Sequence, residues 1–65
     1  MKLTVNGEAK DVAAARLDEL LGELGLAGQA VAVELNRQVV PKSAHAATPL
    51  AEGDAVELVT LVGGG

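Results

Sequence analysis

The chain has 65 residues, a formal net charge of −4 at pH 7 and a hydrophobic fraction of 49%. It contains no cysteine, no aromatic residue and a single histidine, so we expect no disulfide and no cysteine or multi-histidine metal site. Base stacking needs aromatic rings and phosphate contacts need a surplus of Lys and Arg, so a nucleic-acid partner is not expected. These limits predict one small domain with a thin aliphatic core.

The chain opens with the pattern of a β-hairpin. Leu3 and Val5 alternate with polar neighbours, which indicates a half-buried strand. Asn6-Gly7 follows, and both residues tolerate the positive φ angles of a tight hairpin turn. We therefore expect residues 8–12 to form the returning strand.

A helical period replaces the strand pattern from about Ala14. Four leucines then recur at the spacing of one helix face: Leu17, Leu20, Leu21 and Leu24. Gly25 stands where a left-handed residue commonly ends a helix. The leucine stripe predicts a helix that packs on a sheet.

The second half of the chain is rich in strand patterns. Residues 30–35 and 38–40 are typical of two short strands, and residues 55–62 are typical of a last one. Residues 42–49 between them form an alanine-rich crossing with no clear period. Its single histidine, His45, has no partner in sequence, so we expect it at the surface and assign it no role.

Two strands, a helix and three more strands predict an α+β fold. A single leucine stripe needs one sheet face to cover it, which a mixed four- to five-stranded sheet on one α-helix supplies. By analogy, this order suggests the β-grasp, or ubiquitin-like, architecture. We expect residues 1–62 to form this domain and residues 63–65 to form a flexible C-terminal glycine tail. A frayed end is the simpler reading of three terminal glycines.

Several stretches of the chain, taken together, carry a resemblance to a known family. They are Val5-Asn6-Gly7-Glu8, Leu17 to Leu21, Ala32 to Pro41 with its Asn-x-x-x-Val-Pro pattern, Leu50 to Val59 with its Glu52-Gly53-Asp54 turn, and Gly64-Gly65. Each motif is weak alone, but in this order they resemble the ThiS-type sulfur carriers of thiamine biosynthesis.

The resemblance implies a function for the chain end. The carboxylate of Gly65 would be adenylated and then converted to a thiocarboxylate, while Gly63 and Gly64 would thread the active sites of partner enzymes. The implied partners are a ThiF-type adenylyltransferase, a sulfur donor such as a cysteine desulfurase, and thiazole synthase, which takes the sulfur. No cofactor or metal would be bound, since the adenylating enzyme uses the ATP. The chain would be a protein co-substrate and not an enzyme.

The last strand predicts where partners bind. By alternation, Glu57, Val59 and Leu61 share one face, and the charge of Glu57 marks this face as exposed. Val59 and Leu61, together with Val62, are therefore candidate partner contacts beside the tail. The alternative is that Val59 and Leu61 are ordinary strand residues covered on both sides.

Other functions stay open at this point. Another carrier of the same fold, similar to the small subunit of molybdopterin synthase, is the nearest alternative. A β-grasp module that docks a partner without tail chemistry is a second. No apolar stretch reaches the roughly 20 residues of a membrane span and no leader pattern precedes the domain, so we expect no membrane association and a cytoplasmic location.

Overall fold

The computed structural model describes residues 1–61, and Val62, Gly63, Gly64 and Gly65 lie outside the described residues. The elements in chain order are β1 (Lys2–Val5), β2 (Glu8–Asp11), α1 (Leu17–Glu23), β3 (Val31–Leu35), β4 (Gln38–Val40), the 3₁₀-helix η1 (Lys42–Ala47) and β5 (Ala55–Thr60). The expected order of strands and helix is confirmed, and η1 is an addition to it.

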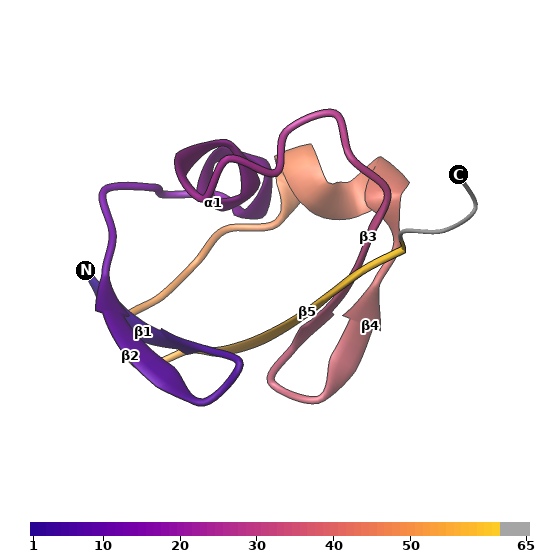
Figure 1. The fold of residues 1–65 in the computed structure, drawn as a ribbon. Coiled ribbons are helices and arrows are strands. Elements are labelled where there is room, and N and C mark those ends of the chain that lie inside the picture. The colour runs from indigo at the N-terminus through magenta and orange to yellow at the C-terminus, as the bar shows by residue number, and fades with distance from the viewer. Residues whose placement is uncertain (62–65) are drawn as a thin grey trace.

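The five strands form one mixed sheet in the order β2-β1-β5-β3-β4. β5 pairs with β1 in parallel and with β3 in antiparallel fashion, while the β1–β2 and β3–β4 pairs are antiparallel hairpins. The last strand of the chain therefore lies in the middle of the sheet. α1 and η1 both lie on one face of the sheet (Figure 1), which we call the inner face, and the opposite face is called the outer face.

The inner face holds the core. Side chains of β1, β3 and β5 meet the leucine stripe of α1, and Leu17 and Leu20 have no exposed surface. The remaining buried hydrophobic residues are Leu3, Val5, Val12, Ala14, Leu21, Val33, Leu50, Val56 and Leu58. Burial of aliphatic side chains thus stabilises the domain without aromatic residues.

The helix is shorter at its start than predicted. It begins at Leu17, not near Ala14, because carboxylates of the helix bond the N–H groups of the residues before it, which keep a non-helical backbone. Glu19 Oε1 accepts the N–H groups of Ala15 and Arg16, each at 3.0 Å. Glu23 Oε1 likewise accepts the N–H of Ala14 at 3.0 Å. These bonds satisfy backbone donors that the alanine side chains cannot serve.

The predicted end of the helix is confirmed. Gly25 has a φ of +78°, the left-handed conformation that glycine adopts without a steric cost. The N–H of Leu26 donates to the carbonyl of Leu21 at 2.7 Å, and the N–H of Gly25 donates to that of Gly22 at 3.1 Å. This pair of bonds is the Schellman motif.

The surface position expected for His45 is wrong. His45 belongs to η1 and is only 6% exposed, because η1 packs against α1. Its Nε2–H donates to the carbonyl of Val40 at 3.2 Å. The crossing therefore contains a 3₁₀-helix that its composition did not predict. The imidazole bonds to the backbone carbonyl of Val40, two residues before this helix.

The last strand ends earlier than predicted. β5 stops at Thr60, which pairs with Val31, the first residue of β3. One further bond follows, from the N–H of Leu61 to the carbonyl of Ala30 at 2.9 Å. The strand ends here because its partner strand β3 begins here.

Candidate functional site

The candidate site lies at the C-terminal end of β5, where the chain leads to its glycines. The antiparallel ladder with β3 runs from Val56 opposite Leu35 to Thr60 opposite Val31. The bond from Leu61 to Ala30 extends it by one residue. The β1 ladder covers only the first two residues of β5, so among residues 1–61 the pairing with β3 is what holds the end of the strand that leads to the glycines.

The start of β5 is held by the turn between β3 and β4. Asn36 exchanges backbone and side-chain bonds with Ala55: its N–H donates to the Ala55 carbonyl at 2.7 Å, and its Oδ1 accepts the Ala55 N–H at 2.9 Å. Asn36 Nδ2 also donates to Asp54 Oδ1 at 3.0 Å. One asparagine thus fixes the first residue of the strand.

The turn between β1 and β2 holds the middle of β5 in a similar way. The parallel β1–β5 ladder pairs only Thr4 and Val5 with β5 residues. Asn6 continues it, since its N–H donates to the Val56 carbonyl at 2.8 Å and its Oδ1 accepts the Leu58 N–H at 2.7 Å. The sequence analysis took Asn6 only as a turn residue and missed this contact, which depends on a residue far along the chain.

The turn at Glu52-Gly53-Asp54 has a structural role. Asp54 Oδ2 accepts the N–H of Ala51 at 2.8 Å. Glu52 Oε2 accepts the N–H of Lys2 at 3.0 Å, and Gly53 has a φ of +86°. Both carboxylates bond the backbone, so they do not form a pair of free acids.

The exposure predicted for the partner-binding residues is confirmed for the two that are described. Val59 is 59% and Leu61 is 58% exposed, whereas the alternating Val56 and Leu58 are buried. Partner binding by Val59, Leu61 and Val62 stays a prediction. Gly63, Gly64 and Gly65, like Val62, lie outside the described residues, so the structure places none of them relative to Val59.

The sequence analysis missed a third exposed apolar residue. Val39 in β4 is 74% exposed and pairs with Glu34 of β3. Adjacent residues of a strand point to opposite faces, and Val40 is half-buried on the inner side. Applying the same alternation to residues 38–40 would have placed Val39 on the outer face.

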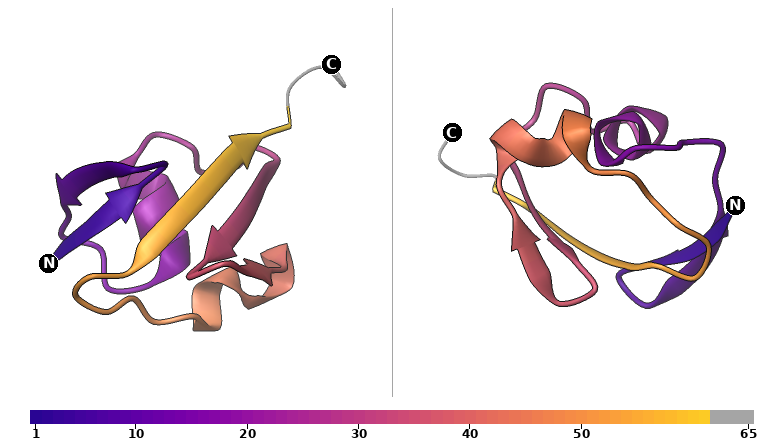
Figure 2. Two further views of the ribbon diagram at one scale, coloured as in Figure 1. Left: turned by 90° about the horizontal axis from the view of Figure 1, so that it is seen from below. Right: turned by 180° about the vertical axis from the view of Figure 1, so that it is seen from behind.

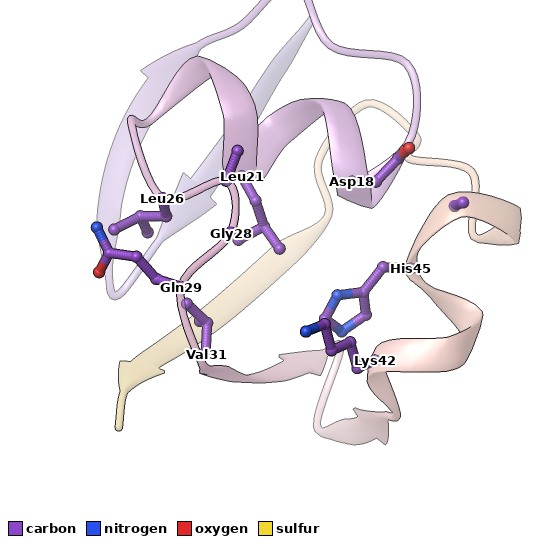
Figure 3. Close-up of a pocket in the computed structure, with 10 residues that line it drawn as sticks. Asp18, Leu21, Leu26, Gly28, Gln29, Val31, Lys42 and His45 are labelled. Carbon is purple, nitrogen blue, oxygen red and sulfur yellow. The ribbon is translucent and has the colours of Figure 1, made fainter. Parts of the chain in front are cut away.

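A groove of about 370 Å³ lies on the helical side of the molecule, between the end of α1, the loop after it and η1. Lys42 and His45 of η1 lie next to each other on one side of it, and Leu21, Leu26 and Val31 line its apolar part (Figure 3). Within residues 1–61, no group of three His, Cys, Asp or Glu residues could hold a metal ion.

The same described part of the chain contains no helix that is long and apolar enough to cross a membrane.

A helix across one face of a mixed five-stranded sheet, with the last strand in its centre, defines a protein of the β-grasp, or ubiquitin-like, class. The model of the ThiS family matches residues 3–65. The chain therefore belongs to the ThiS family, and the resemblance to ThiS-type sulfur carriers noted in the sequence is confirmed.

Solved structures agree with this assignment. The crystal structure of the thiamine biosynthesis protein ThiS from Geobacter metallireducens is 44% identical, with a TM-score of 0.81 and complete coverage of both chains. The solution NMR structure of a thiamine biosynthesis protein from the same organism is 43% identical, with a TM-score of 0.80, over all of this chain and 88% of that one.

Two curated relatives are larger proteins. The chain is 46% identical to the thiazole synthase of Paramagnetospirillum magneticum and 42% identical to that of Magnetococcus marinus, over 66 aligned residues in each case. Each match takes in all of this chain, which spans only 20% of the length of these relatives.

Proposed function

We propose that this protein is the sulfur carrier of the thiazole branch of thiamine biosynthesis. It acts as a protein co-substrate and not as an enzyme. The observation that carries the proposal is the ThiS family match over residues 3–65, which includes the terminal glycines. The full-length likeness to the Geobacter protein supports the same pathway.

The working group is the carboxylate of Gly65. A carboxylate oxygen attacks the α-phosphorus of ATP in the adenylating enzyme, pyrophosphate leaves, and an acyl-adenylate forms. A sulfur nucleophile then displaces AMP, so that a thiocarboxylate ends the chain. The carrier itself binds no cofactor and no metal, because the ATP is held by its partner.

Glycine suits each of these steps. Without a Cβ atom, Gly63 and Gly64 fit a narrow channel and adopt backbone conformations that are closed to other residues. The acyl carbon of Gly65 is open to attack for the same reason. The firm anchoring of β5 by Asn6 and Asn36 supports a role in which the domain is gripped while the chain end enters a partner.

The proposed partners are a ThiF-type adenylyltransferase, a sulfur donor such as a cysteine desulfurase, and thiazole synthase. The last is supported by the two relatives named thiazole synthase, which contain a segment similar to this chain. The reaction would take place in the cytoplasm.

The test is the intact mass of the protein after incubation with the ThiF-type enzyme, ATP and a sulfur donor. We expect a gain equal to the replacement of one oxygen by sulfur, located at Gly65 by fragmentation. A variant that lacks Gly65 and one with a single residue added after it serve as controls, and neither should react. An unchanged mass with an enzyme that adenylates a known carrier would overturn the proposal.

A further inference from the structure

The outer face of the sheet carries an unusual arrangement of charge. Neither helix of residues 1–61 covers this face, and β5 crosses its middle in the view from below (Figure 2, left). Glu34 of β3 and Glu57 of β5 lie directly opposite each other in the antiparallel register, and both are exposed. Like charges in directly opposed positions of a sheet destabilise it.

Neither glutamate is neutralised by the described part of the chain. The ion pairs within residues 1–61 join the terminal amine to Asp11, Lys10 to Glu8, and Arg16 to Asp18 and Glu19. Glu34 and Glu57 take part in none of them. The pair is therefore an unfavourable feature of the free domain that a cation from outside could relieve.

Two apolar side chains lie beside this acidic pair. Val39 is opposite Glu34 on β4, so it continues the same row across the sheet. Val59, two residues after Glu57, is opposite Ala32 in the row nearer the chain end. With Leu61, these are the large hydrophobic residues that the described chain leaves exposed. The outer face thus presents two carboxylates beside two valines.

An arginine fits this arrangement well. Its planar guanidinium can donate to two carboxylates at once, and its aliphatic stem packs on apolar surface. When a partner covers Val39 and Val59, water is excluded beside the glutamates, and the hydrogen bonds between the guanidinium and the carboxylates become stronger. A lysine can supply the charge but not the two-pronged geometry.

We propose that thiazole synthase docks on this outer face and places an arginine between Glu34 and Glu57, with apolar side chains over Val39 and Val59. The inference rests on the proposed function. Thiazole synthase is chosen as the occupant because a segment similar to this chain occurs within two proteins of that name. The face lies on the strand that leads to Gly65, so docking here holds the chain end beside the enzyme.

The proposal predicts that removing one of these charges raises stability and weakens binding together, which the loss of an ordinary surface charge would not do. Replacing Glu57 by Gln relieves the repulsion, so the free domain should unfold at a higher urea concentration, while its binding to thiazole synthase should weaken. Glu34→Gln should act the same way. Glu8→Gln is the control for lost charge alone: Glu8 is exposed on β2 away from this face, and because it pairs with Lys10 its replacement should not raise stability.

The experiment is a calorimetric titration of each variant with the thiazole synthase of the same organism, at low and at moderate salt. We expect Glu34→Gln and Glu57→Gln each to raise Kd about tenfold and to reduce its salt dependence. Glu8→Gln should stay within about twofold of the wild type. Val39→Ser, which keeps all charges, should also weaken binding.

Two results would overturn the docking proposal. One is a Kd for Glu57→Gln within about twofold of the wild type. The other is an equal loss for Glu8→Gln, which would mean general attraction of an acidic protein. The mass measurement separates the docking proposal from the proposed carrier function. If the wild type gains sulfur and binds thiazole synthase, and the Gln variants bind equally well, only the docking proposal is refuted. A wild type that neither gains sulfur nor binds refutes both.

Discussion

The inner face of the sheet buries Val33, Val56 and Leu58 beneath the leucines of α1, whereas the outer face leaves Val39 and Val59 exposed. Both sets are aliphatic side chains of one sheet, and within β5 only the alternation of the backbone separates them. The inner set is what the fold requires. The outer set adds little to the stability of the free domain, and it lies beside two opposed glutamates whose repulsion lowers stability. The inner face therefore stabilises the fold, whereas the outer face keeps large apolar side chains of residues 1–61 accessible to solvent.

The largest expected difference between the faces is in core truncation. Leu20→Ala removes a fully buried side chain and should lower the free energy of unfolding by about 2–5 kcal/mol. Val59→Ala, the control on the outer face, should change it by less than about 0.5 kcal/mol. Urea unfolding followed by far-UV circular dichroism measures both, since the chain has no aromatic reporter. Equal losses for the two variants would abolish the distinction between the faces.

The next largest expected effect on stability comes from Asn6, whose side chain bonds the central strand β5. Asn6→Gly keeps the positive φ of +51° available but removes the acceptor of the Leu58 N–H. We expect a loss of about 1–2 kcal/mol, because that amide is partly buried and left without a partner. Faster hydrogen exchange at Leu58 should accompany the loss. Unchanged stability and exchange would show that the β1–β2 turn does not hold β5.

The helix that covers the inner face allows a paired test of Gly22 within it and Gly25 just after it. Gly25→Ala should destabilise the domain by about 1 kcal/mol, because the residue has a φ of +78°. Gly22→Ala should stabilise it by about 0.5–1 kcal/mol, since a Cβ there meets nothing within 4 Å and alanine favours the helix. Thermal unfolding of the two variants should thus shift in opposite directions. A shift in the same direction would contradict the observed helix end.

The smallest effect concerns the outer face itself. Glu34→Gln or Glu57→Gln should raise the free energy of unfolding by about 0.2–1 kcal/mol, and salt should reduce the gain. Because either substitution removes the same repulsion, the double variant should gain less than the sum of the two. The measurement is a double-mutant cycle at low salt. Additive gains would mean that the two side chains do not interact.

Much of the fold was predictable because its signals are local. The leucine stripe of α1, the Asn6-Gly7 hairpin and the alternation of β5 each follow from residues close together in sequence. The exposure of Val59 and Leu61 was predictable for the same reason.

The missed features depend on contacts between distant segments. The helix start is a local exception: Glu19 and Glu23 accept backbone N–H groups three to nine residues before them, so that the helix begins only at Leu17. η1 and the burial of His45 depend on packing against α1, which six residues without a period do not reveal. The opposition of Glu34 and Glu57 depends on the register of strands more than twenty residues apart. The opposition of the two glutamates therefore needed the structure, while the helix, the hairpin and the exposed side of β5 did not.

Sulfur delivery is the central claim, and a single turnover with thiazole synthase tests it most directly. The protein is first converted to the Gly65 thiocarboxylate, verified by mass, and then mixed with an excess of thiazole synthase and its other substrates. We expect the chain to return to the mass of the carboxylate while one thiazole product forms per carrier. A thiocarboxylate that persists while the same enzyme accepts sulfur from another carrier would contradict a role in thiazole formation.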